Sequence, residues 1–154
     1  MPKAIWTTEK YQTCLTDMGN LLSRLVPQVQ KYERLLMRSL GVSASQGSLL
    51  LKILQQPGIS MGEAAAHLGV DVSTLTRIAA LLIRDSLVNK TPEDQDKRRF
   101  GLNLTDLGRE KTLVIQQEVR IYYRRLIEEL PPGHVREIME SVKLLSVAME
   151  KALA

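Results

Sequence analysis

One short charged segment contains residue types that could contact a polyanion. It lies within residues 91–108, which read TPEDQDKRRFGLNLTDLG. Three acids are followed closely by three bases, namely Glu93, Asp94 and Asp96, then Lys97, Arg98 and Arg99. Three adjacent cations on a loop can attract a negatively charged partner. The alternative is a solvated hairpin loop, so the interpretation depends on the elements on either side.

A second group of polar residues lies in residues 58–77, GISMGEAAAHLGVDVSTLTR. The alanines at 64–66 allow two helices to cross closely, Gly69 permits a turn, and Asp71 can cap the second helix. The polar residues near the start of that second helix are Ser73, Thr74, Thr76 and Arg77. Hydroxyl groups can contact phosphates or base edges, and arginine can make a bidentate contact to guanine. The segment therefore predicts a helix-turn-helix, whose second helix can place its N-terminal side chains in a major groove.

The elements that position these groups follow from the spacing of apolar residues. Steps of three and four from Tyr11 to Leu36 predict one long helix, which Pro27 is expected to kink or interrupt. Capping and stop signals predict three shorter helices, which run from Ser43 to Gln55, from Met61 to Leu68 and from Val72 to Arg84. Ser60 and Glu63 have the spacing of a capping box for the second of these.

The apolar period then changes to two. This change predicts a strand at Leu87–Lys90, a turn from Pro92 to Lys97 and a second strand through Phe100, Leu102 and Leu104. Thr105 is expected to cap a further helix, the segment 131–133 (PPG) to end it, and residues 135–149 to form the last helix. The predicted fold class is mainly α with a small β-hairpin wing (α+β). It is a winged helix-turn-helix flanked by long N- and C-terminal helices whose apolar stripes suit packing against another chain.

The composition is that of one globular domain. The 154 residues are 44% hydrophobic and carry a net charge of +4 with a pI of about 9.3, which is compatible with nucleic-acid binding. The single cysteine, Cys14, excludes an intramolecular disulfide framework. There is no apolar run long enough for a membrane span and no signal-peptide pattern, so a cytoplasmic protein with no membrane partner is expected.

The two polar segments together resemble a known family. Asp96, Arg98, Leu104, Thr105 and Gly108 match the D-x-R-x-x-x-x-x-L-T-x-x-G signature of the MarR family of transcription regulators. The sequence VSTLTR at 72–77 also looks like the recognition helix of that family. The resemblance implies a single MarR-like domain over residues 1–154. Its DNA-binding lobe would be 43–105, and 1–40 and 106–154 would be dimerisation helices of an obligate homodimer.

The resemblance also implies roles for the wing residues. Arg98 would enter the minor groove, Asp96 would orient it, and Lys97 and Arg99 would contact phosphates. The sequence departs from the family pattern at three positions, with Ser86 for a common Gly, Lys90 for Arg and Ala64 for Leu. An effector pocket, often for small anionic aromatic molecules in this family, is expected to involve Tyr32, Gln46, Arg120, Tyr122, Tyr123 and Arg124.

The predicted function is that of a homodimeric regulator, a repressor released from a pseudo-palindromic operator by a small effector. Two alternatives remain open at this point. One is a winged-helix module that binds proteins, and the other is a regulator switched by oxidation of Cys14. His67 and His134 are too scattered for a zinc site, and no catalytic constellation is present. No metal, no cofactor and no enzymatic activity are expected.

Overall fold

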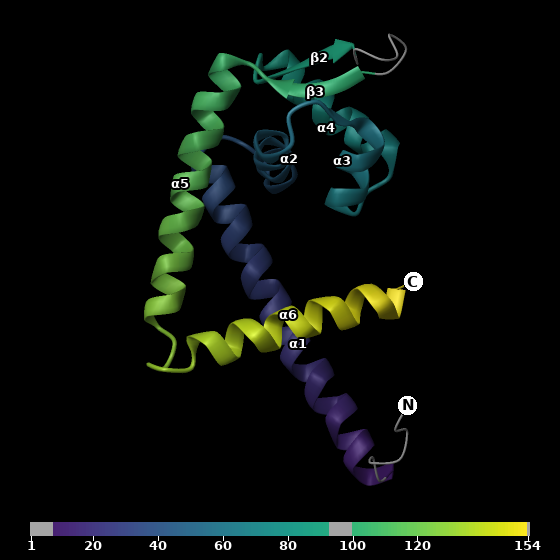
Figure 1. Ribbon diagram of the computed structural model, residues 1–154, viewed down its shortest axis with the longest axis vertical. Helices are drawn as coiled ribbons and strands as arrows, with labels where there is room; N and C mark the ends of the chain where they lie inside the picture. Colours follow the sequence, from purple (N-terminus) through teal and green to yellow (C-terminus); the bar gives the residue numbers. More distant parts are fainter. Residues whose placement is uncertain (1–7, 93–99, 154) are drawn as a thin grey trace. The chain divides into compact units, whose positions relative to one another are not determined.

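The computed structural model describes residues 8–92 and 100–153 (Figure 1). The elements in chain order are α1 (Thr8–Ser39), α2 (Ala44–Gln55), β1 (Ile59–Ser60), α3 (Met61–Leu68), α4 (Val72–Arg84), β2 (Val88–Pro92), β3 (Phe100–Leu104), α5 (Asp106–Glu128) and α6 (Val135–Leu153). The predicted fold class, mainly helical with a small wing, is confirmed. The chain divides into two compact units between Ile115 and Gln116.

The ends of the short helices are fixed by local hydrogen bonds. Ser60 and Glu63 form the predicted capping box, in which the Glu63 amide donates to Ser60 Oγ (3.2 Å) and the Ser60 amide donates to Glu63 Oε2 (3.0 Å). Ser43 and Gln46 form a second capping box at the start of α2. Gly69 ends α3 in the left-handed conformation with φ of 65°, which glycine adopts without steric cost.

Helix α1 continues through Pro27, so the predicted interruption is wrong. Proline has no backbone N–H and removes one hydrogen bond from a helix. A helix of 32 residues tolerates the loss of one hydrogen bond. The long apolar stripe is therefore carried by one continuous element.

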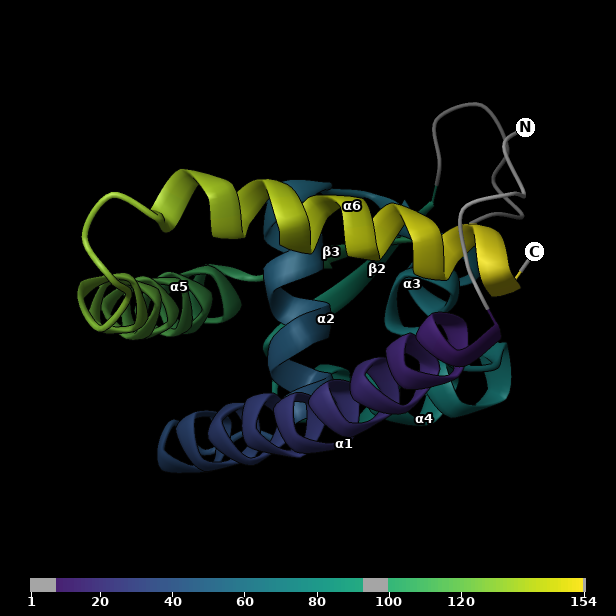
Figure 2. The same cartoon turned by 90° about the horizontal axis from the view of Figure 1, so that it is seen from below.

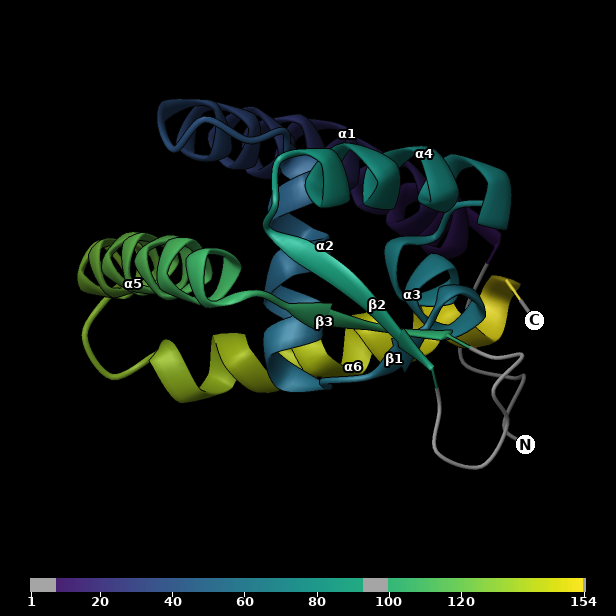
Figure 3. The same ribbon diagram turned by 90° about the horizontal axis from the view of Figure 1, so that it is seen from above.

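The wing is part of a three-stranded antiparallel sheet with strand order β1-β3-β2. Sequence analysis missed β1, which pairs Ile59 with Leu102 and Ser60 with Gly101. The first wing strand was predicted to end at Lys90, but β2 extends to Pro92, which pairs with Phe100. The sheet closes one side of the lobe, with β2 and β3 running beside α2 and α4 (Figure 3).

The core of the first unit lies between this sheet and helices α2, α3 and α4. Its largest fully buried apolar side chains are Leu49, Leu50, Ile53, Ile59, Leu75, Leu82, Val88, Leu102 and Ile115. They come from six different elements, so each element is held by the others. The second unit contains α5 from Gln116 onward and the whole of α6. The two helices are joined through Pro131, Pro132 and Gly133 (Figure 2).

A cluster of backbone contacts joins the end of α4, the wing and the start of α5. We call Ser86, Leu87, Thr105 and Gly108 the wing joint. Thr105 Oγ1 donates to the Ser86 carbonyl (2.7 Å) and accepts from the Gly108 amide (2.9 Å), while the Thr105 amide donates to the Leu87 carbonyl (3.1 Å). A Cβ atom on Gly108 would overlap the Leu87 carbonyl oxygen. The Thr-x-x-Gly part of the sequence signature is thus a packing requirement of the fold.

Ser86 forms the turn for which the sequence lacks the usual glycine. Its φ is 57°, the only positive φ among the described non-glycine residues. The Leu87 amide donates to the Leu82 carbonyl (2.9 Å), and the Ser86 amide donates to the Ile83 carbonyl (3.0 Å). These two bonds make a Schellman motif, which holds the serine in the left-handed region.

No single helix of the described ranges is both long and apolar enough to cross a membrane. Helices α3 and α4 reach those limits only when they are joined across a bend of 104°.

Candidate nucleic-acid interface

Helix α4 has one buried face and one exposed polar face. Leu75, Ala79 and Leu82 are buried in the lobe. The exposed residues of the first two turns include Ser73, Thr76 and Arg77, while Thr74 is half-buried. Residues 73 and 77 lie one turn apart, so their side chains are neighbours on the helix surface. The four residues predicted for the recognition helix therefore lie on one short stretch at the surface of the lobe.

The carboxylate of Asp71 organises the start of this helix. It accepts hydrogen bonds from the Ser73 hydroxyl, from the Thr74 amide (2.7 Å) and from the Thr74 hydroxyl (2.8 Å). The Ser73 hydroxyl, followed by the Thr74 amide and hydroxyl, holds the pKa of the Asp71 carboxyl well below its usual range. Asp71 is therefore ionised at neutral pH, and it carries a negative charge at the exposed end of the helix.

The other two polar residues of the helix differ in what they can donate. The Thr76 hydroxyl donates to the Val72 carbonyl (2.8 Å), as threonines in helices commonly do. Arg77 makes no ion pair within the described part of the chain, and its side chain is exposed. Of these residues, Arg77 is the one whose donors are available to a ligand.

The structure describes the two strands of the wing but not the wing residues that were predicted to contact DNA. Asp96, Lys97, Arg98 and Arg99 fall outside the described residues. The ladder that carries them ends with the pair Pro92–Phe100. Asn103 Nδ2 donates to Thr91 Oγ1 (2.6 Å) across the two strands, and Lys90 is exposed on β2.

The residues predicted for an effector pocket belong to both units. Tyr32 is half-buried on α1, and the side-chain oxygen of Gln46 accepts from the Ser43 amide (2.8 Å) in the capping box. In the second unit, the Tyr122 and Tyr123 rings lie 5.3 Å apart with an interplanar angle of 56°. Arg120 and Arg124 are exposed. The roles of these residues in effector binding remain predictions.

Sequence analysis missed a basic hollow between the end of α1 and the start of α2. Its volume is about 650 Å³. It is lined by Lys31, Arg34, Leu35, Arg38, Val42, Ser43, Ala44 and Ser45. The three cations are spaced by three and four residues, which puts them on one helix face, and this spacing was available in the sequence. None of the three makes an ion pair with another described residue.

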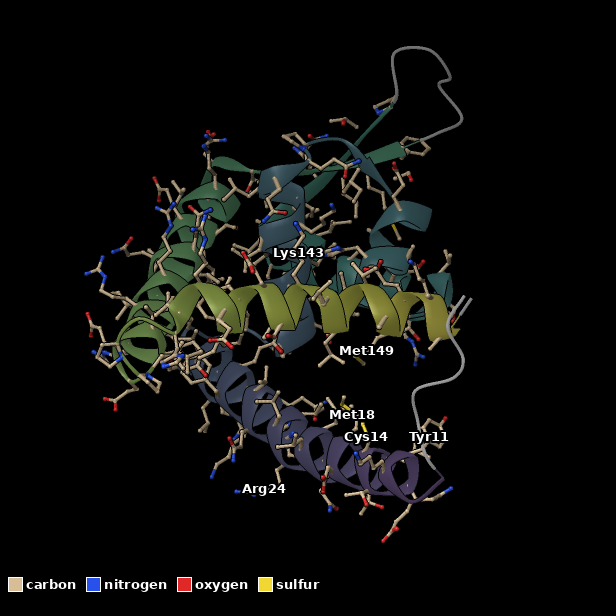
Figure 4. The ribbon with its side chains drawn as sticks, turned by 60° about the horizontal axis from the view of Figure 1, so that its bottom comes forward. Tyr11, Cys14, Met18, Arg24, Lys143 and Met149 are labelled. Carbon is tan, nitrogen blue, oxygen red and sulfur yellow. The ribbon has the colours of Figure 1, made fainter. Side chains whose placement is uncertain are left out.

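The remaining candidates for a chemical role are groups of metal-binding side chains and the single cysteine. In residues 8–92 and 100–153 no three His, Cys, Asp or Glu side chains lie together where they could hold a metal ion. Cys14 is a free, exposed thiol on α1 (Figure 4). A redox role for it stays a prediction.

Comparison with known proteins agrees with the winged helix-turn-helix interpretation of this lobe. Residues 42–100 match the family model of the MarR family. Members of this family are transcription regulators that bind DNA, and the chain is similar to them over these residues.

Individual relatives show the same similarity. The uncharacterised HTH-type transcriptional regulator YfiV of Bacillus subtilis is 21% identical over 113 residues, which are 73% of this chain and 71% of YfiV. The structure of Streptococcus pneumoniae FabT in complex with DNA superposes with a TM-score of 0.78 at 17% identity, covering 90% of this chain and 99% of FabT. The structure of CouR from Rhodococcus jostii RHA1, bound to p-coumaroyl-CoA, superposes with a TM-score of 0.72 at 24% identity. The match covers 84% of this chain and 91% of CouR. At these identities, the structures show that the fold is shared.

Acid is expected to destabilise the helix-turn-helix through its two caps. Hydrogen bonds from the Ser60 side chain and backbone lower the pKa of Glu63. Hydrogen bonds from Ser73 and Thr74 lower the pKa of Asp71 in the same way. A carboxyl whose folded pKa is depressed stabilises the fold fully above its unfolded pKa, near 4, and loses that contribution as the pH falls further. The urea midpoint should therefore drop between pH 5 and pH 3, and the drop should be smaller in Asp71→Asn. Equal drops in wild type, Asp71→Asn and the exposed control Glu110→Gln would contradict this assignment.

Proposed function

We propose that this protein is a homodimeric repressor of the MarR type that binds a pseudo-palindromic operator and releases it when a small anionic effector binds. Residues 43–105 form the lobe that reads DNA, and residues 1–40 and 106–154 supply the dimerisation helices of one MarR-like domain. The observation that carries the proposal is the exposed polar face of α4, together with the exposed apolar side chains of α1 and α6.

The apolar surface of α1 supports a second copy as the partner. Its exposed large apolar side chains are Tyr11, Leu15, Met18, Leu21, Leu25, Val26, Val29 and Leu35. Those of α6 are Met139, Val142, Leu144, Val147 and Met149. Each such side chain stabilises an interface by removing apolar area from water, at about 25 cal/mol per Å². A two-fold dimer buries both surfaces at once and presents two α4 helices to one DNA duplex.

Selection from randomised duplex DNA with the full chain tests this proposal. The expected motif has two inverted half-sites whose centres lie about 10 base pairs apart, one helical turn, as a two-fold dimer requires. Binding should weaken steeply with salt because phosphate contacts release counterions. If no motif is enriched and binding is insensitive to salt, the lobe is a protein-interaction module instead.

The basic hollow supports the anionic character of the effector. Lys31, Arg34 and Arg38 face it without acidic partners among the described residues. CouR, which shares the fold, binds an acyl-CoA thioester, a molecule with several negative charges. An effector releases DNA only if it binds the DNA-free state more tightly than the DNA-bound state.

A panel of aromatic carboxylates and acyl-CoA thioesters, added to the protein–operator complex, tests the effector proposal. At least one compound should raise the Kd for the operator. Arg34→Gln and Arg124→Gln then distinguish the hollow from the predicted site on α5, because only the variant that touches the effector loses the response. The proposal fails if no anionic compound changes operator affinity.

Replacing Arg98 with alanine is expected to weaken operator binding by about 1–3 kcal/mol and to leave the dimer intact. The physical reason is the loss of a guanidinium from the minor groove, where the negative potential is strongest. Fluorescence anisotropy with labelled operator measures the change. The comparison variant Lys97→Ala should weaken all sequences alike and reduce the salt slope by about 1. Wild-type affinity in Arg98→Ala would show that the signature arginine does not contact DNA.

A further inference from the structure

The hydroxyl groups at the start of α4 have already used their hydrogens. Those of Ser73 and Thr74 point to the carboxylate of Asp71, and that of Thr76 points to the Val72 carbonyl. Ionised carboxylates and carbonyls can only accept hydrogen bonds, so each hydroxyl must be the donor. A hydroxyl has one hydrogen and two lone pairs. All three side chains can therefore offer a ligand only lone pairs.

This arrangement makes the start of the helix an acceptor surface with a negative charge. Phosphates and the keto edges of guanine and thymine also present acceptors, so none of them matches it. In the major groove the complementary groups are the exocyclic amines, N6 of adenine and N4 of cytosine. Carboxylates also accept from cytosine N4. Arg77, one turn further along, is the nearby donor on the same exposed face of the helix.

We propose that Asp71 determines the sequence specificity of this protein by fixing the hydroxyls of Ser73 and Thr74 as acceptors. The start of α4 then selects an amino base, adenine or cytosine, at one position of each half-site, and Arg77 contacts a guanine or a phosphate nearby. This inference rests on the proposed function, in which α4 lies in the major groove.

The substitution Asp71→Asn removes the negative charge and reverses one of these hydrogen bonds with little change in shape. The asparagine oxygen can still accept from the Thr74 amide, which caps the helix, and from the Ser73 hydroxyl, because both bond the same carboxylate oxygen. The NH₂ group takes the place of the other oxygen and can donate to the Thr74 hydroxyl, which frees the hydrogen of Thr74 for DNA. Asp85→Asn is the matched control, because Asp85 is an exposed acid at the other end of the same helix.

Selection from randomised DNA is run with wild type, Asp71→Asn, Ser73→Ala and Asp85→Asn. Wild type and Asp85→Asn should prefer amino over keto bases about fivefold to tenfold at one position per half-site, as expected for one hydrogen bond of about 1 kcal/mol. Asp71→Asn and Ser73→Ala should each weaken that preference at the same position, the first by reversing the Thr74 hydroxyl and removing the negative charge, the second by removing the Ser73 oxygen.

Modified operators then test the amine itself. The adenine at that position is replaced with purine, or the cytosine with 2-pyrimidinone, so that only the amino group is lost. Wild type should bind this operator about fivefold to tenfold more weakly. In Asp71→Asn the difference between the two operators should shrink to about twofold, because the Thr74 hydroxyl no longer presents only lone pairs and the negative charge is gone.

The outcomes separate this inference from the proposed function. If no motif is enriched by wild type, the proposed function fails, and the inference fails with it. If a motif is enriched but shows a keto base at that position, or if the amino preference is unchanged in Asp71→Asn and Ser73→Ala, the regulator stands and the inference is overturned. Circular dichroism checks each variant. Should Asp71→Asn unfold, Ser73→Ala decides, because Ser73 does not cap the helix.

Discussion

Replacing Gly108 with alanine is expected to destabilise the winged helix-turn-helix lobe by about 3 kcal/mol or more. The added Cβ would overlap the Leu87 carbonyl oxygen, which is backbone and cannot rotate away as a flexible side chain could. Moving Leu87 would also disturb two hydrogen bonds. In one the Leu87 amide donates to the Leu82 carbonyl, and in the other the Thr105 amide donates to the Leu87 carbonyl. One methyl group therefore strains the end of α4, the wing and the start of α5 together.

Thermal unfolding followed by circular dichroism measures this effect. A loss of 3 kcal/mol corresponds to a fall in Tm of about 6–12 °C for a chain of this size. Gly62→Ala is the matched control, since a Cβ at Gly62 meets no atom within 4 Å. Its Tm should equal or slightly exceed that of wild type, because alanine favours helix over glycine. Equal melting of Gly108→Ala and Gly62→Ala would show that the wing joint is not tightly packed.

Replacing Leu25 with glutamate is expected to convert the dimer to a monomer and to weaken operator binding at least about 100-fold. Leu25 is 51% exposed in the single chain and lies in the middle of the apolar stripe of α1. In the proposed dimer, the new carboxylates would be buried without partners, at a cost of several kcal/mol. A monomer contacts one half-site and loses the gain of about 10²–10⁴ that comes from joining two binding units.

Sedimentation velocity gives the oligomeric state, and anisotropy gives the operator affinity of the same preparations. Asn20→Glu is the matched control, because it adds the same charge to the same helix on its polar side. It should remain dimeric with operator affinity close to that of wild type. A Leu25→Glu variant that sediments with wild type would exclude this stripe as the dimer interface, and a monomeric wild type would exclude the dimer.

The parts of the fold that the sequence predicted well are those set by near neighbours along the chain. The Ser60–Glu63 capping box, the Asp71 cap and the Gly69 turn each depend on residues within about four positions. Strand β1 has no such local signal. It consists of two residues, and it exists because Ile59 and Ser60 meet Leu102 and Gly101, more than forty positions later. Pairing at that distance is a property of the tertiary structure.

The candidate site shows the same limit. The residue types on α4 indicated a surface that contacts DNA, and the exposed positions of Ser73, Thr76 and Arg77 agree with that interpretation. The sequence did not show the direction in which the hydroxyls donate. That direction depends on how the Asp71 carboxylate turns back over the first turn of the helix. The basic hollow was missed because its lining combines one face of α1 with the start of α2.

The ladder between β2 and β3 has a consequence for how this regulator can diversify. The strands pair from Val88–Leu104 at the base to Pro92–Phe100 at the far end, and the base is fastened by the wing joint. The connection between Pro92 and Phe100 therefore begins and ends at two residues that are partners in the β-ladder. Lengthening such a connection costs only about 0.6 kcal/mol per doubling of its length. The length of this connection can thus evolve by insertion or deletion, while the lobe that carries it keeps its packing.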